Sequence, residues 1–410
     1  MTNKKKIIND PVHGFINIPG GIIYELIEHP YFQRLRRIQQ LGLSCLVYPG
    51  AVHTRFQHAI GSMHLIGMAI DVIRSKNHEI TDEEAEAAKI AILLHDIGHG
   101  PFSHALENCF TPTLSHEEIS FLFMKRLNSD FGGKLDLAIK IFRNKYHKKF
   151  LHQLISGQLD MDRLDYLKRD SFFTGVSEGI VGSERIIKML QVVDDNLVVE
   201  AKGIYSIEKF LIARRLMYWQ VYLHKTSLIA ELLLSAFIKR LKYLCLCDDF
   251  NTNIPYFNNL INNIKIRNDE DIIRNFSMLD DNDIISLLKQ YLNSEDKILS
   301  YLSNGIINRN FPKILISKEK PEISMVDNIR QLTQKSLNLT DEEILYFVYT
   351  GEVSNNAYSY ADERINILYP NKLIDISEAS DMLNISVLGK IVKKYYVCAP
   401  KEVMNLIVLK

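Results

Sequence analysis

The sequence predicts a mainly α-helical fold, with short β segments near both ends of the chain. Apolar residues recur at helical spacing through most of the 410 residues. Two capping-box patterns, Thr81 with Glu84 and Ser115 with Glu118, mark helix starts. Only 19 glycines and 11 prolines interrupt the pattern, which excludes a fibrous or disordered chain.

The predicted elements follow in chain order. Residues 15–18 form a strand after the turn-like DPVHG, and residues 387–400 and 405–410 read as strands at the other end. Helices are expected at 22–29, 31–42, 55–75, 82–96, from 116 onward, and at 135–146, 159–170, 205–243 and 283–292. Composition shifts after about residue 240. We therefore expect a core at 1–240 that holds the site chemistry, followed by a smaller α+β region at 241–410 for scaffolding and assembly.

Composition narrows the classes of function. The 49 basic and 49 acidic side chains cancel, which argues against strong nucleic-acid binding. Five cysteines without a CxxC pair indicate neither a disulfide framework nor a cysteine-rich zinc module. The N-terminus lacks the apolar core of a signal peptide, and no apolar run approaches the roughly 20 residues of a membrane span. A cytoplasmic protein is expected.

Histidine is confined to the first part of the chain. All 13 histidines lie between His13 and His224. Because histidine is the commonest metal ligand and a frequent acid–base catalyst, such chemistry is expected there.

The strongest candidate for that chemistry is the His95-Asp96 pair. Roughly one such dipeptide is expected by chance in a chain this size, but this one ends an apolar helix and runs into IGHGPFSH. Imidazole and carboxylate together suit a divalent ion of Fe, Mn, Zn, Co, Ni or Mg, and no thiolate points to structural zinc.

Two helical faces allow two interpretations each. In LDMDRLDYLKRD, Asp162, Asp165, Tyr166 and Arg169 share one side of a helical wheel. This side is either an ordinary solvated face with an Asp165–Arg169 pair or part of a metal-and-phosphate pocket. Further on, a stripe of cationic and aromatic side chains either binds phosphates and stacks on a base or belongs to a core helix. The stripe consists of Arg214, Tyr218, Tyr222 and Lys225.

Several enzyme classes lack their motifs. The sequence contains no GxxxxGK[ST], no GxGxxG after a strand and no GxSxG. P-loop, Rossmann and α/β-hydrolase readings therefore have no support.

The ordered motifs HTRFQHAIGSMH, AILLHDIGHGPFSH, SHEE, LDMDRLDYLKRD and YWQVYLHK resemble those of the HD-domain deoxynucleoside triphosphate (dNTP) triphosphohydrolases. The resemblance covers residues from about 6 to 235. It implies an HD helical core and metal-dependent hydrolysis of dNTPs to deoxynucleoside and inorganic triphosphate. Two alternatives stay open: an HD phosphohydrolase acting on another phosphoester, and a non-catalytic nucleotide sensor.

The same resemblance implies roles for individual residues. The implied metal ligands are His58, His95, Asp96 and Asp162, and the implied catalytic pair is His116, as general acid, with Glu107. The implied phosphate contacts are His99, His104, Arg55, Arg163, Tyr166 and Arg214. The implied sugar contacts are Gln40 and Asp170 at the 3′-hydroxyl, with Leu41 and Tyr222 crowding the 2′ carbon.

Two departures from the family pattern matter. Glu107 replaces an aspartate, which keeps the charge on a longer side chain. Leu223 replaces a glutamine that can contact a base, so the base preference stays open. The resemblance further implies an activating nucleotide at a second site formed by Lys6, Glu28 and Arg36, and a homo-oligomer. We also expect the Glu107 carboxylate to hold the proton on His116, against the helix dipole that disfavours it.

Overall fold

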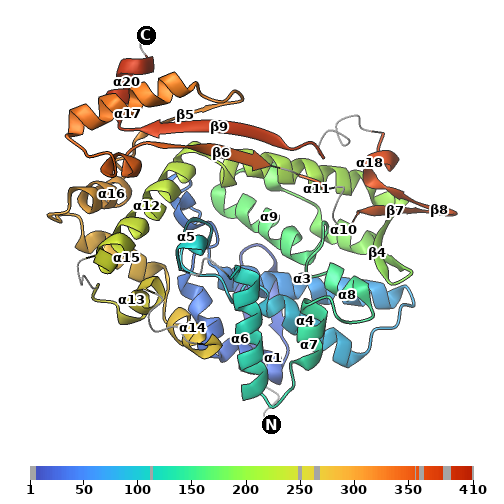
Figure 1. The fold of residues 1–410 in the computed structure, drawn as a ribbon. Coiled ribbons are helices and arrows are strands. Elements are labelled where there is room, and N and C mark those ends of the chain that lie inside the picture. Colours follow the sequence, from blue (N-terminus) through green and yellow to red (C-terminus); the bar gives the residue numbers. More distant parts are fainter. Residues whose placement is uncertain are drawn as a thin grey trace.

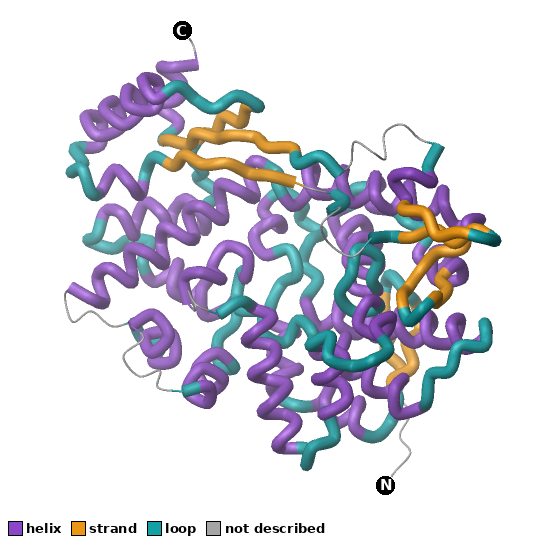
Figure 2. Tube along the Cα trace, turned by 45° about the vertical axis from the view of Figure 1, so that its right-hand side comes forward, coloured by secondary structure: helices purple, strands orange, loops and turns teal. Residues whose placement is uncertain are grey.

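The computed structural model confirms a mainly α-helical fold with small sheets (Figure 1). It describes residues 6–110, 114–247, 252–262, 268–355, 357–359, 364–381 and 389–408. Helices fill the centre of the molecule, and the strands form small separate groups (Figure 2).

The first half of the chain supplies most of the helical centre. A hairpin of β1 (Lys6–Asp10) and β2 (Gly14–Ile18) precedes the helices. The helices are α1 (Ile22–Glu28), α2 (Pro30–Gln33), α3 (Arg55–Ser75), α4 (Asp82–Leu94), α5 (Ser103–Phe110), α6 (His116–Asp130), α7 (Asp136–Phe142), α8 (Lys149–Gln153), α9 (Met161–Thr174) and α10 (Ser183–Met189). Short 3₁₀ helices at Arg34–Arg37 and Gly42–Leu46 lie between α2 and α3.

Helix α3 is the central element, because it packs against both α4 and α9. Gly61 permits the close approach to α9. A Cβ atom at this position would lie 2.0 Å from Asp165 Oδ1 and 2.3 Å from Arg169 Nη2. The glycine therefore brings the polar side of α9 directly onto α3.

The two predicted capping boxes differ. At α4, the Thr81 side chain and the Glu84 side chain cap each other's backbone, as predicted. At α6, Ser115 accepts a hydrogen bond from the Glu118 backbone, but the Glu118 carboxylate pairs with Arg143 Nη1 at 2.5 Å. Only half of the second box forms, because the guanidinium draws its glutamate away.

The single helix predicted at 205–243 is wrong. The structure has α11 (Ile204–Met217), a π-helical turn (Tyr218–Tyr222) and α12 (Lys225–Cys247), and the two helices are bent by 56°. Leu223 N donates to Tyr218 O at 2.7 Å, and His224 Nδ1 accepts from Thr226 N at the start of α12. Neither a glycine nor a proline marks this break, so hydrophobic periodicity alone misses it.

The second half adds helices and two sheets. Its helices are α13 (Pro255–Asn262), α14 (Asp269–Phe276), α15 (Asp281–Gln290), α16 (Lys297–Ile307), α17 (Ile323–Leu337), α18 (Ile376–Ala379) and α20 (Lys401–Val408). Its strands are β5 (Lys313–Ser317), β6 (Tyr349–Asn355), β7 (Asn366–Tyr369), β8 (Lys372–Asp375) and β9 (Val392–Ala399). Strands β5, β9 and β6 form an antiparallel sheet.

Two further expectations about strands are corrected. The segment at 405–410 was expected to be a strand, but residues 401–408 form α20, whose Val403 and Met404 are buried. Strands β3 (Leu190–Val193) and β4 (Asn196–Glu200) lie in the middle of the chain, where none was expected. Strand β4 pairs in parallel with β7, so the sheet β3-β4-β7-β8 joins both halves of the chain.

The proposed boundary at residue 240 lies inside α12, and one apolar core includes residues from Ile16 to Cys398.

In the described part of the chain, no single helix is long and apolar enough to cross a membrane. One bent pair of segments, Ala201–Tyr222 and Lys225–Leu246, reaches that length and hydropathy only when the two segments are taken together.

Candidate metal centre and adjoining cavity

Three side chains from different helices converge on one point. His58 lies on α3, His95 is the C-cap of α4, and Asp162 lies in the first turn of α9. Their ligand atoms all lie within 4.8 Å of one another. Asp162 Oδ1 is 2.9 Å from His58 Nε2 and 3.4 Å from His95 Nε2.

This cluster fits a divalent metal ion. The Nε2 atoms of His58 and His95 are buried and make no hydrogen bond of good geometry to any described residue. Both face the same carboxylate oxygen, and imidazole with carboxylate is a donor set that binds transition metals. The predicted ligands His58, His95 and Asp162 are thus brought together.

The fourth predicted ligand, Asp96, lies beside this cluster. Its Oδ1 is 3.3 Å from His95 Nε2 and 3.1 Å from His99 Nε2. Its Oδ2 accepts from Arg55 Nη1 at 2.5 Å and lies 3.9 Å from His58 Nε2. Asp96 therefore shares its charge between the cluster and the Arg55 guanidinium.

A buried network behind His58 was missed at the sequence level. Asp165 Oδ2 lies 2.8 Å from His58 Nδ1, and its other oxygen lies 2.7 Å from His13 Nε2. Arg169 donates to both Asp165 oxygens at 2.9 Å and reaches Asp10 at 2.8 Å. Asp165 and Arg169 are fully buried, so the interpretation as a solvated face is wrong, although the predicted pair forms.

This network sets the charge and orientation of His58. Burial lowers the pKa of His58, but the neighbouring carboxylates of Asp162 and Asp165 outweigh burial and raise the pKa to about 10. Burial likewise opposes ionisation of Asp165, yet Arg169 and the two histidines hold its pKa well below the usual range. A carboxylate behind a histidine fixes which ring nitrogen faces the metal.

A cavity of about 570 Å³ opens beside the cluster. This volume lies within the range of roughly 300–1,000 Å³ that is usual for small-molecule sites. Its lining includes most of the predicted substrate contacts. These are Gln40, Leu41, Arg55, His99, Arg163, Tyr166, Asp170 and Tyr222. The predicted metal ligands Asp96 and Asp162 and the predicted catalytic His116 line the same cavity.

The wall formed by Asp170 is built by residues from three segments. Asp170 Oδ1 lies 2.7 Å from His53 Nε2, and Asp170 Oδ2 accepts from the Tyr222 hydroxyl at 2.7 Å. His53 stacks on Phe173 with ring centroids 4.5 Å apart, and its carbonyl accepts from Gln40 N at 2.9 Å. His53 had no predicted role. Its place one residue before the cap Thr54 gave no signal of one.

The three arginines predicted to contact phosphates each have a different partner in the fold. Arg55 is buried and donates to Asp96 and to Ser103 Oγ at 3.0 Å. Arg163 pairs with Asp160, the N-cap residue of the same helix. Burial lowers the pKa of Arg163, but the Asp160 charge outweighs burial, so the pKa of Arg163 is raised. Arg214 is buried on α11 and reaches Gln158 Oε1 at 3.5 Å.

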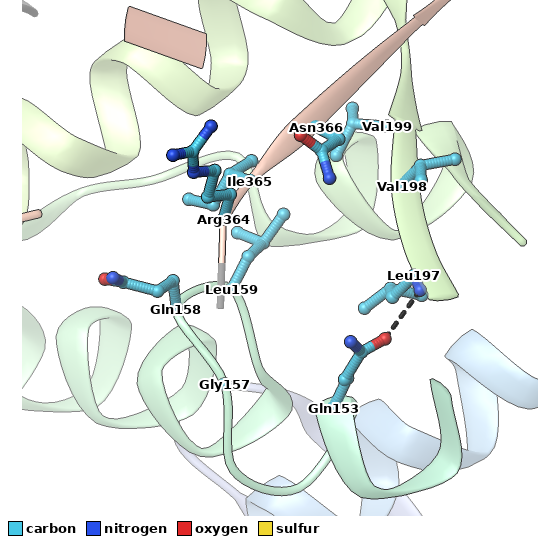
Figure 3. A pocket seen from close by; sticks show the side chains of 10 residues that line it. All are labelled: Gln153, Gly157, Gln158, Leu159, Leu197, Val198, Val199, Arg364, Ile365 and Asn366. Atoms are coloured by element: carbon cyan, nitrogen blue, oxygen red, sulfur yellow. Dashed lines mark hydrogen bonds between the residues drawn. The ribbon is translucent and has the colours of Figure 1, made fainter. Parts of the chain in front are cut away.

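Gln158 connects that arginine to a much smaller cavity of about 30 Å³ (Figure 3). The amide nitrogen of Gln158 donates to Ser359 O at 2.7 Å. Arg364 and Asn366 also line this cavity, which has room for about one water molecule. It therefore joins the two halves of the chain but cannot hold a nucleotide.

The predicted catalytic histidine is next to the metal cluster. His116 begins α6, and its ring stacks on His99 with centroids 4.1 Å apart. Burial, helped by Arg55, lowers the pKa of His99 well below its usual range, which makes His99 a neutral donor to Asp96. His104 and Glu107 lie on α5, but their side chains fall outside the described residues.

A second cavity of about 420 Å³ is lined by His95 and Asp162 of the cluster. Asp96, His116, Asp162 and Arg163 line both cavities. The cluster therefore lies where the two cavities adjoin.

Asp281, the first residue of α15, binds backbone groups of two segments that line the larger cavity, and Leu279, just before α15, binds the Arg34 side chain. Asp281 accepts from Gln39 N at 2.8 Å and from Phe102 N at 3.1 Å. Arg34 Nη1 donates to Leu279 O, and its Nη2 donates to the carbonyl of His99. Burial raises the pKa of the Asp281 carboxyl to about 7. Asp281 belongs to the histidine-free part of the chain, which was expected to be scaffold and not part of the site.

The residues of the expected activator site are partly brought together. Lys6 Nζ lies 2.6 Å from Glu28 Oε1, and both side chains are exposed. Arg36 instead donates to Gln33 Oε1 at 2.8 Å and lies over the Phe56 ring.

Comparisons with known proteins agree with this geometry. The HD domain model matches residues 55–170, and the model of an HD associated region matches residues 181–245. The crystal structure of a phosphohydrolase from Bacteroides thetaiotaomicron is 54% identical with a TM-score of 0.92, covering 97% of this chain and 100% of that one.

Two relatives extend the comparison. The uncharacterized protein YwfO of Bacillus subtilis is 32% identical over 82% of this chain and 77% of its own length. The deoxynucleoside triphosphate triphosphohydrolase SAMHD1 homolog of Dictyostelium discoideum is 32% identical over 62% of this chain. The match spans about half (53%) of that relative's length.

The helical fold and the histidine–aspartate cluster define an HD-domain phosphohydrolase. Within that class, the chain belongs to the HD-domain dNTPase-like family.

Proposed function

We propose that this protein hydrolyses deoxynucleoside triphosphates to deoxynucleosides and inorganic triphosphate. The observation that carries the proposal is the cavity itself. Asp162 of the metal cluster lines the cavity together with Arg55 and Arg163, and the same cavity contains the Asp170–Tyr222 pair. Cations beside a metal centre suit a polyphosphate, and a carboxylate with a neighbouring tyrosine suits a sugar hydroxyl.

In this proposal, the cavity binds both the triphosphate and the sugar of the substrate. Arg55, Arg163 and Tyr166 contact the phosphates, with Arg214, His99 and His104 contributing from the surrounding elements. The side-chain amide of Gln40 donates to the 3′-hydroxyl, and the Asp170 carboxylate accepts from it. Leu41 and Tyr222 leave no room for a 2′-hydroxyl. Their positions in the cavity wall support these roles for all but Arg214 and His104.

The proposed chemistry occurs at the α-phosphorus. A divalent ion held by His58, His95, Asp162 and Asp96 supplies charge neutralisation at the phosphate and activates water. His116 donates a proton to the departing 5′ oxygen of the nucleoside, and Glu107 holds that proton on His116. The stacked His99 ring positions His116 at the edge of both cavities.

Product analysis tests this proposal. The purified protein is analysed for Fe, Mn, Zn, Co, Ni and Mg and is then incubated with each dNTP and each metal, with and without a mixture of the other nucleotides as activator. Chromatography should show deoxynucleoside and triphosphate in equal amounts. Release of pyrophosphate, or turnover of monophosphates or cyclic nucleotides instead, would assign the site to another phosphoester. Binding without turnover in every mixture would make the protein a sensor.

The proposal extends to assembly and activation. Relatives in this family include dNTP triphosphohydrolases, and we propose a homo-oligomer with an activating nucleotide near Lys6, Glu28 and Arg36. Light scattering with and without dNTPs measures the oligomer, and the product assay measures activation.

A further inference from the structure

Glu231 is a carboxylate in the cavity wall to which nothing so far assigns a role. It lies on α12, six residues after that helix begins and therefore roughly 9 Å along it. Its neighbours Ile229, Ala230, Leu233 and Leu234 are apolar and buried, while Ser227 and Ser235 lie one turn before and after it. A lone acidic residue on such a helix calls for an explanation.

The Glu231 side chain is half-buried in the cavity wall. No hydrogen bond or ion pair connects Glu231 to any other side chain that the structure describes, and burial raises its pKa to about 7. An unpaired carboxylate in apolar surroundings destabilises a fold. Such a group at a cavity wall is typical of a ligand contact.

Glu231 also lies in a distinct part of the cavity. Helix α12 packs against the 3₁₀ helix Gly42–Leu46 and against α5. Glu231 therefore lines the cavity together with that 3₁₀ helix, with Ala105 of α5 and with Leu223. The metal cluster is formed by α3, α4 and α9 instead. A nucleotide with its phosphates at the cluster and its sugar at Asp170 therefore has its base to place near Glu231.

We propose that Glu231 reads the base of the substrate and selects guanine. This inference rests on the proposed function and assigns the base preference that Leu223 leaves open. Guanine is the common base that presents two adjacent N–H donors, N1–H and the 2-amino group, on its pairing edge, and a carboxylate presents two acceptors. Adenine and cytosine each place an acceptor beside the donor, and thymine places its one N–H between two carbonyls, so lone pairs would face the carboxylate.

Competition among substrates tests the proposal. An equimolar mixture of dGTP, dATP, dCTP and dTTP is incubated with the metal-loaded full chain at pH 8, where Glu231 is ionised. All four substrates see the same activators, so their relative rates give the ratio of kcat/KM directly. The wild-type protein should consume dGTP about tenfold faster than dATP, the discrimination expected of one bidentate contact.

Two variants and one control sharpen the test. Glu231→Gln keeps the shape but offers one acceptor and one donor, which pair with adenine, so it should lower the dGTP-to-dATP ratio about tenfold. Glu231→Leu should remove base preference altogether. Glu86→Gln, an equivalent change at an exposed position on α4, should leave the ratio unchanged. Unchanged ratios in both Glu231 variants would overturn the proposal.

Binding separates this proposal from the proposed function. If no dNTP is hydrolysed, equilibrium dialysis of dGTP and dATP against the same proteins still reports base reading. Tighter dGTP binding that Glu231→Gln abolishes would support Glu231 while the triphosphohydrolase assignment fails. Equal dGTP and dATP binding in the wild type, or no binding of either nucleotide, would overturn the role of Glu231.

Discussion

Two buried carboxylates on α9, Asp165 and Asp170, lie five residues apart, about 1.4 turns of the helix, and serve opposite ends of the site. Asp165 is enclosed by His13, His58 and Arg169, and its charge is balanced inside the fold. Asp170 is held by His53 and the Tyr222 hydroxyl, and no described lysine or arginine pairs with it. The comparison teaches that one helix supplies two kinds of carboxylate. The charge of Asp165 is neutralised by Arg169 behind the metal centre, whereas Asp170 keeps its charge in the wall of the substrate cavity.

The most damaging change should be at the metal end itself. Asp162→Asn removes the carboxylate oxygen that faces both His58 and His95. We expect bound metal to fall from about one ion per chain to near zero. Phosphohydrolase activity should fall by about a thousandfold, because the loss corresponds to roughly 4 kcal/mol of charge stabilisation. Elemental analysis and product chromatography measure the two effects.

The exposed variant Glu86→Gln controls for loss of one acidic charge. A metal content that stays near one ion per chain in Asp162→Asn would show that the cluster is not the metal site.

The contrast between the two carboxylates predicts unequal effects on stability. Asp165→Asn removes the charge that Arg169, His13 and His58 share and leaves Asp10 as the one described carboxylate that still pairs with the fully buried Arg169. Breaking one partner out of such a buried network costs about 3 kcal/mol or more of unfolding free energy. Asp170→Asn disturbs two hydrogen bonds without stranding a guanidinium, so we expect about 1–2 kcal/mol. Urea denaturation of the metal-free proteins measures both values, and equal losses would refute the distinction.

The sequence predicted the contacts at the metal end of the site more completely than those at the sugar end. The context of the His95-Asp96 pair indicated a metal site, and the family resemblance, whose motifs are local in sequence, implied the ligands His58, His95, Asp96 and Asp162. His53 and Asp281 act across more than 100 residues of sequence, and no periodicity reports such contacts.

The fold shows the same division. Capping residues and apolar spacing predicted α3, α4 and α9 closely. The π-turn at Tyr218–Tyr222 escaped prediction, because it depends on tertiary packing and not on a local breaker. Likewise β4 pairs with a strand more than 160 residues away, and its four-to-five-residue pattern is too short to distinguish from a helix end.

The balanced charge at the metal end predicts how metal binding depends on pH. In the metal-free protein the carboxylates of Asp162 and Asp165 raise the pKa of His58 to about 10, so His58 carries a proton at pH 7. A metal ion must displace that proton. Apparent affinity should therefore strengthen about tenfold for each pH unit as the pH rises from 6 to 9.

Titration of the metal-free protein with Mn²⁺ in buffers of different ionisation enthalpy counts the protons released. We expect at least one proton for each ion bound at pH 7. Asp165→Asn removes one of the hydrogen bonds that raises the pKa of His58, so it should flatten the pH dependence above pH 8. An affinity that is constant between pH 6 and 9 would contradict the charged state of His58.

The smallest effect is expected at the sugar end, where Tyr222 has two separable contributions. Its hydroxyl donates to Asp170, and its ring lines the cavity. Tyr222→Phe removes one hydrogen bond worth about 1 kcal/mol, so kcat/KM for dGTP should fall roughly fivefold. The ring remains, so the preference for dGTP over GTP should persist. Tyr222→Ala should lose that preference, because it opens space at the 2′ carbon. A Phe variant that hydrolyses GTP as readily as dGTP would show that the hydroxyl, held by Asp170, and not the ring excludes ribonucleotides.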